Sequence, residues 1–141
     1  MIDRNTAPYA ATLLRLSLGV MFIAHGLLKV LVFTVPGTVQ FFESQGFPGI
    51  SAYAVIAAEL LGGAALILGW QVRWISAALI PVLLGAFIVH WPNGWLFTAN
   101  GGGWEYPLFL AIAAGVQVLL GSGACALDNL RVTVQPTLQR A

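Results

Sequence analysis

Charged side chains are scarce in this sequence of 141 residues, of which only 8% are aspartate, glutamate, lysine or arginine. An ordinary soluble domain has roughly 25% charged residues. Hydrophobic residues make up 59% of the chain, so a water-soluble fold would lack the polar side chains needed to cover its surface. The composition therefore predicts an integral membrane protein in contact with the lipid bilayer. The net charge of +1 and the absence of a basic tract give no support for nucleic-acid binding.

Cysteine is nearly absent as well, since Cys125 is the one thiol in the sequence. A lone cysteine cannot form a disulfide within the chain, and the sequence has neither a Cys-x-x-Cys motif nor a thiolate metal cluster. Redox chemistry would therefore need electrons from a bound cofactor, a quinone or a partner protein. Because no activating base lies next to it, we expect Cys125 to be an apolar filler rather than a nucleophile.

Long apolar segments dominate the remainder of the chain, at residues 9–33, 52–70, 74–91 and 106–121. A helix needs ~20 residues to cross a bilayer, and the last two segments are short but sufficient. Arg15 interrupts the first segment and the apolar run continues to Phe33, which argues for a retained helix rather than a cleaved signal peptide. We predict an all-α, four-helix transmembrane bundle that forms a single domain over residues 1–141.

The positions of the basic residues predict the orientation of the four segments. Those outside the apolar segments lie on the N-terminal tail, the second connection and the C-terminal tail: Arg4, Arg73, Arg131 and Arg140. The first and third connections contain none, so both termini should face the cytoplasm of a multi-pass protein in the plasma (inner) membrane. The long first connection is then external. Its aromatic residues predict a short interfacial helix that ends at Gly46.

Five ionisable side chains lie inside the apolar segments or at their rims: His25, Lys29, Glu59, His90 and Glu105. With the termini in the cytoplasm, alternating helix directions bring all five toward the outer end of the bundle. Charged groups at membrane depth are costly and occur mainly where they pair or line a functional cavity. We therefore predict one shared site near the outer leaflet.

Roles follow from the chemistry of these groups. Imidazole and carboxylate groups can exchange protons with a bound quinone or quinol. The predicted catalytic residues are His25 and Glu59 for proton exchange and Lys29 for charge balance. Residues predicted to complete the pocket around the quinone are His90, Glu105, Trp91 and Trp104.

Other interpretations of the same residues stay open. The charges could serve structure alone, with Lys29 paired to Glu59 or Glu105 and Arg15 bound to backbone carbonyls. Haem held between the two histidines, or a metal held by them and Glu59, is less favoured because both histidines lie near the rim and no single helix has metal-ligand spacing. No metal ligand is assigned. Membrane anchoring alone would also explain most of the tryptophans.

The ordered set of motifs resembles the DoxX family of small membrane proteins. The matching elements are Leu14-Arg15-Leu16, Gly19, Phe22, His25-Gly26, Lys29, Gly46-Phe47-Pro48, Glu59-Leu60-Leu61-Gly62-Gly63, Gly69, Arg73, His90, Gly102-Gly103, Glu105-Tyr106, Gly121 and Asp128. The resemblance implies a four-helix membrane domain in a redox-associated family. Its members are linked to terminal quinol oxidase complexes, thiosulfate:quinone oxidoreduction and membrane oxidative-stress systems.

These observations lead to one main prediction and two alternatives. The main prediction is a membrane component of a redox system, a possible quinone-linked oxidoreductase subunit, that binds a quinone or quinol near the outer leaflet. One alternative is a noncatalytic scaffold or assembly subunit that holds a redox-enzyme complex at the bilayer. The other is a small carrier, although no internal repeat typical of carriers is visible. Partner subunits and association with a second copy are both compatible with the sequence.

Overall fold

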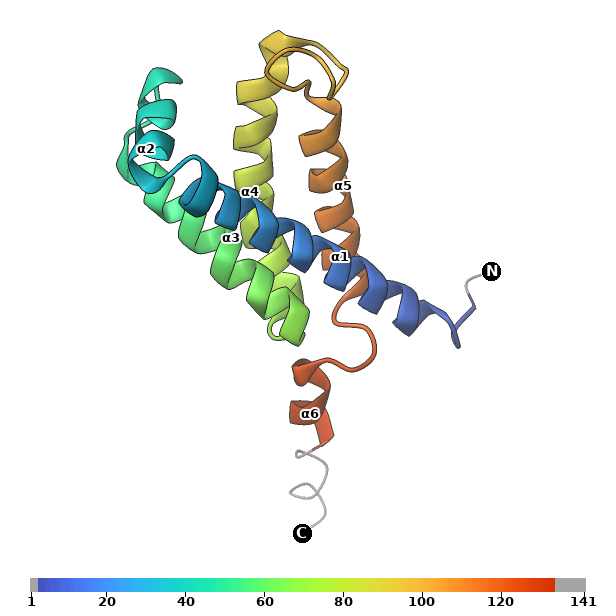
Figure 1. Cartoon of the computed structure of the whole chain (residues 1–141). Helices are drawn as coiled ribbons and strands as arrows, with labels where there is room; N and C mark the ends of the chain where they lie inside the picture. Colours follow the sequence, from blue (N-terminus) through green and yellow to red (C-terminus); the bar gives the residue numbers. More distant parts are fainter. Residues whose placement is uncertain (1–2, 134–141) are drawn as a thin grey trace.

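The computed structural model describes residues 3–133 and contains helices joined by loops, without strands over that range (Figure 1). The elements in chain order are α1 (Ala7–Leu27), the π-helical turn η1 (Leu28–Val32), α2 (Val35–Ser44), α3 (Ile50–Leu68), α4 (Val72–His90), the 3-10 turn η2 (Trp91–Asn93), α5 (Glu105–Leu120) and α6 (Leu127–Thr133). The prediction of an all-α protein is confirmed. The helices cover the four apolar segments with ends within two residues of those expected, and a helix occupies the first connection. Arg140 lies outside the described residues.

Three helical segments are long and apolar enough to cross a membrane, namely Ala7–Val32, Ile50–Leu68 and Val72–Asn93. The fourth, α5, is apolar but has 16 residues. At a rise of 1.5 Å per residue it spans about 24 Å, which is shorter than the ~30 Å hydrocarbon core of a typical bilayer. Large apolar side chains on the helices face outward, among them Leu61, Trp74 and Leu119. Such surfaces are suited to lipid rather than to water.

The main helices pack as two pairs, because α1 lies along α3 and α4 lies along α5. The first pair crosses the second, and α2 caps one end of it (Figure 1). Glycines permit the close approach of α1 and α3. A Cβ atom on Gly19 would lie 2.9 Å from the carbonyl oxygen of Gly63, and a Cβ on Gly63 would lie 2.8 Å from that of Gly19. Backbone-to-backbone contact through small residues is a common way to join helices in membranes.

A distant carboxylate closes the turn between α3 and α4. Helix α3 is followed by its C-cap residue Gly69, which has a left-handed backbone with φ of 72°. The backbone N–H groups of Gln71 and Val72 then donate to the carboxylate of Asp128, at 2.8 and 3.2 Å. N–H groups at the start of a helix have no partner within the helix, so Asp128 acts as the cap of α4.

Arg15 is buried at the same end of the molecule, where 1% of the residue is exposed. Its guanidinium donates to four backbone carbonyl oxygens at 3.1–3.4 Å: Leu66 and Ile67 at the end of α3, and Ala124 and Cys125 in the segment before α6. The interpretation that Arg15 binds backbone carbonyls is therefore confirmed. One guanidinium joins α1, α3 and the C-terminal segment.

Candidate functional site

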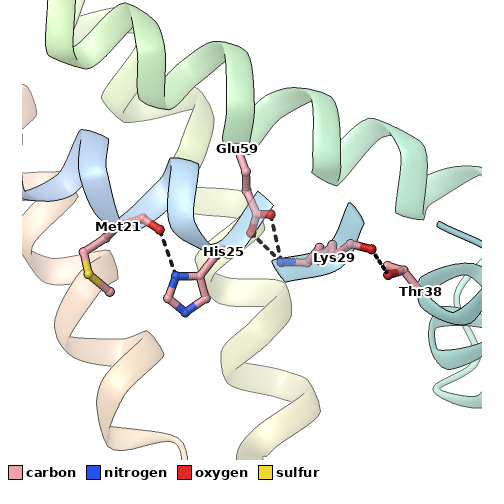
Figure 2. Close-up of polar contacts among 5 residues, drawn as sticks. All are labelled: Met21, His25, Lys29, Thr38 and Glu59. Carbon is pink, nitrogen blue, oxygen red and sulfur yellow. Dashed lines mark hydrogen bonds and ion pairs between the residues drawn. The ribbon is translucent and has the colours of Figure 1, made fainter. Parts of the chain in front are cut away.

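An ion pair between η1 and α3 forms the polar centre of the site (Figure 2). The ammonium of Lys29 lies 2.8 Å from both carboxylate oxygens of Glu59. Only 5% of Glu59 is exposed, as is 19% of the Lys29 side chain. In an apolar surrounding each charge depends on the other, because an unpaired buried ion carries a large desolvation cost. The two residues therefore act as one unit.

Lys29 lies in the π-helical turn η1, and α2 helps to hold the backbone there. The buried hydroxyl of Thr38 is 3.0 Å from the carbonyl oxygen of Lys29, to which it donates, and equally close to that of Thr34 (Figure 2). Single π-helical turns often occur at functional sites. The hydroxyl contact joins α2 to the backbone that carries the ion pair.

Replacing Thr38 with valine should lower the free energy of unfolding by about 1–2 kcal/mol, because it removes the hydroxyl that the Lys29 carbonyl accepts from. Unfolding in detergent measures this change. Thr38→Ser keeps the hydroxyl and is expected to lose clearly less. If serine and valine cost the same, the hydrogen bond is not what stabilises η1.

His25 lies one helical turn before Lys29, and its ring nitrogen Nδ1 is 2.8 Å from the carbonyl oxygen of Met21 (Figure 2). A carbonyl oxygen can only accept, so Nδ1 carries the hydrogen, and in the neutral ring Nε2 is the acceptor. Within residues 3–133, Nε2 has no protein hydrogen-bond partner. The ring stacks on Tyr106 of α5 with a centroid distance of 6.0 Å and an interplanar angle of 26°. His25 is thus oriented with one nitrogen available to a ligand.

A cavity of about 430 Å³ extends from these residues toward α2 and α4. Its polar wall includes His25, Lys29, Glu59 and Tyr106, whereas the apolar lining includes phenylalanines of α2 and several residues of α4. Ligand pockets in proteins typically measure about 300–1,000 Å³ and combine apolar walls with a few polar groups. The cavity meets both criteria.

His90 lies on the wall of the same cavity and also fastens the long loop between α4 and α5. Its Nδ1 is 3.0 Å from the carbonyl oxygens of Gly101 and of Gly102. The side-chain amide of Asn93 donates to the same two oxygens, at 3.1 and 2.8 Å. His90 therefore connects the position of this loop to the cavity wall.

Glu105, Trp91 and Trp104 are not among the residues that line the cavity. Glu105 turns its carboxylate toward the loop, where Oε1 accepts from the backbone N–H of Phe97 at 2.8 Å. The rings of Trp91 and Trp104 stack at 4.9 Å, and Trp95 meets Trp104 edge-on at 4.5 Å. The structure thus brings four predicted residues together, His25, Lys29, Glu59 and His90. The other three pack around the loop.

The alternatives for a metal or a haem can be compared with this geometry. In the part of the chain that the structure describes, no three histidine, cysteine, aspartate or glutamate residues form a group that could hold a metal ion. His25 and His90 each direct Nδ1 to a backbone carbonyl. These hydrogen bonds fix the orientation of the two imidazole rings in the cavity wall.

No local sequence pattern indicates the role that several residues have at the site. In the sequence Tyr106 appears only as part of the family resemblance, yet its ring stacks on His25. Thr38 lies in a mostly apolar connection and bonds to a backbone atom nine residues away. The aromatic residues of the first connection indicate an interfacial helix, yet Phe41 and Phe42 of α2, and Phe47 after it, line the cavity. Each role depends on tertiary packing rather than on a local pattern.

Comparison with known proteins identifies the family. The DoxX family matches residues 10–91, which is more than half of the chain. A protein of Bacillus subtilis (strain 168) with the name "Putative oxidoreductase CatD" is 34% identical over 116 residues, 82% of each chain. An "Uncharacterized protein" of Haemophilus influenzae is 34% identical over 124 residues, 86% of this chain and 90% of the relative. No solved structure matches. On the family match and on these similarities, the chain belongs to the DoxX family.

Proposed function

We propose that this protein is an integral membrane component of a redox system and that its cavity binds a quinone or quinol. The observation that carries the proposal is the combination of one imidazole nitrogen free to bind and a buried ion pair in a mostly apolar cavity. A quinone or quinol ring fits such a surrounding, because its faces are apolar, the quinone oxygens accept hydrogen bonds and the quinol hydroxyls donate them. The name of the Bacillus subtilis relative gives independent support for redox chemistry.

The proposal includes an arrangement in the membrane. The three long helices and α5 form a four-helix bundle, in which α5 crosses with its 16 residues by tilting little or by local thinning of the bilayer. Both termini face the cytoplasm of the plasma membrane, which the basic residues outside the four apolar segments favour. The cavity then lies toward the outer leaflet, and α2 lies in the interface. The whole of residues 1–141 acts as a single domain.

The side chains have distinct roles in this proposal. His25 accepts a hydrogen bond or a proton at Nε2, and Tyr106 keeps its ring in place. Glu59 exchanges protons with the ligand while Lys29 balances its charge. Oxidation of a quinol releases two protons and two electrons, so a partner redox protein must take the electrons. Glu105, Trp91 and Trp104 act through the loop that His90 connects to the cavity wall.

The test is binding and turnover of a quinol by purified protein, with His25→Ala and Glu59→Gln as variants. Each is expected to weaken binding by about tenfold or more, because a buried polar contact contributes on the order of 1.4 kcal/mol. Glu43→Gln is the matched control, since it removes an exposed carboxylate of α2. If both site variants bind and turn over quinol as the control does, the proposed function is wrong.

A further inference from the structure

One face of α4 forms a continuous strip along the cavity. Its members recur in adjacent pairs four residues apart: Pro81, Val82, Gly85, Ala86, Val89 and His90. Positions four apart in a helix lie above one another on the same face. All of these side chains are small or apolar except His90, which stands at the end of the helix. The strip is therefore a narrow apolar track.

The track reaches the middle of the helix and is open there. Pro81 precedes His90 by nine residues, so it lies about 13 Å from that end of α4. Pro81 is exposed although it lines the cavity, and Phe41 of α2, which also lines the cavity, is 49% exposed. The back wall, which includes Phe22 and Glu59, is buried. An opening at mid-helix depth in a membrane-spanning segment faces lipid rather than water.

Gly85 leaves room in the centre of the track. A Cβ atom built on Gly85 would meet no other atom within 4 Å. Glycine in a helix interior costs stability relative to alanine, by about 0.5–1 kcal/mol, so the space is not explained by packing of the chain against itself.

We infer that the ligand has two parts and enters from the bilayer: a polar ring that meets His25 and the ion pair, and an isoprenoid or acyl chain that lies along the α4 track. The inference rests on the proposed function for the ring and goes beyond it for the chain. The closed, buried polar end and the open apolar end of one cavity match the two ends of such an amphiphile. Gly85 provides the width that the chain occupies.

The test uses two quinone analogues with the same ring, one with a long isoprenoid chain and one with a methyl group in its place. Gly85→Leu places a branched side chain in the track, where a Cβ meets open space. Gly115→Leu is the matched control, since a Cβ there also meets nothing within 4 Å and Gly115 does not line the cavity. Ala86→Leu provides a second blocking variant on the track.

The unchanged protein and the Gly115→Leu control should both bind the long-chain analogue at least about tenfold more tightly than the short one, because the chain buries apolar surface. Gly85→Leu and Ala86→Leu should lose most of that preference and keep the affinity for the short analogue within about twofold. An unchanged preference in both blocking variants, or an equal loss in Gly115→Leu, overturns the inference.

Failure of the inference and failure of the proposed function give different results. If both analogues bind equally well and His25→Ala weakens both, the ring site stands and the chain track is wrong. If neither analogue binds, but a fatty acid binds and Gly85→Leu weakens its binding, the track stands and the quinone proposal is wrong. Both the quinone proposal and the chain track are supported if both blocking variants abolish the long-chain preference and His25→Ala binds weakly.

Discussion

Replacing Lys29 with methionine is expected to lower the free energy of unfolding by about 3–5 kcal/mol, since the loss of one partner of a buried ion pair leaves the other charge uncompensated. The remaining partner would be Glu59, which is 5% exposed and receives both hydrogen bonds from the lysine. Thermal or denaturant unfolding of the purified protein in detergent measures the change.

The double variant Lys29→Met, Glu59→Gln separates charge from packing. Removal of both partners of a buried ion pair is often close to neutral, so the double variant should regain most of the lost stability. A double variant as unstable as the single one would show that the lysine stabilises by packing alone. The same protein also tests the structural interpretation of the pair. If it folds well and still turns over quinol normally, the ion pair has no part in the chemistry.

Replacing Arg15 with methionine should cost about 3 kcal/mol or more, because it removes the charged donor that joins two distant segments to α1, and a hydrogen bond from a charged group contributes about 1.5–3 kcal/mol. Four carbonyl oxygens from two distant segments accept from this guanidinium. The loss should appear as a lower unfolding midpoint and as easier proteolysis near residues 124–126. His25 lies ten residues further along α1, about 15 Å away, so quinol binding at low temperature should change little.

Arg4→Met is the control for the Arg15 prediction, since it makes the same substitution at an exposed position and should change stability by less than about 0.5 kcal/mol. Arg15→Lys should fall between the two, because a compact ammonium cannot reproduce the planar fork of a guanidinium. Equal stability of the Arg15 and Arg4 methionine variants would contradict the role assigned to Arg15.

The helices and part of the site follow from the sequence by simple physics. A chain with so few charges must place them where they pair or do chemistry, and the spacing of His25 and Lys29 puts both on one face of a helix. Alternating helix directions then bring Glu59 to the same depth. That argument uses only helix geometry and the cost of buried charge, which explains why these three residues were identified.

The same argument does not predict the direction of a side chain at the end of a helix, where it can point into the bundle or toward a loop. Glu105 is the first residue of α5, and its carboxylate turns back to the Phe97 N–H. Depth along the membrane places Glu105 near the other ionisable groups, but it does not give the direction of the side chain. The tryptophans behave alike, since Trp91 and Trp104 stack on each other at the loop.

Two further features depend on contacts that no local pattern reveals. The π-helical turn η1 interrupts a segment that reads as one continuous helix. No spacing indicates that Asp128 caps a helix whose first residue lies 56 positions earlier. Both depend on which segments meet in three dimensions.

The distant cap on α4 has a consequence for biosynthesis. The turn between α3 and α4 leaves the ribosome well before Asp128, and translation at about 5–20 residues per second makes the delay roughly 3–11 seconds. The contacts of Arg15 form later still after its own synthesis, because Ala124 and Cys125 follow it by 109 and 110 residues. Nascent chains that stall before residue 124 would lack both the Asp128 cap and the contacts of Arg15 with Ala124 and Cys125. Quality-control proteases would then reach that end of the molecule first.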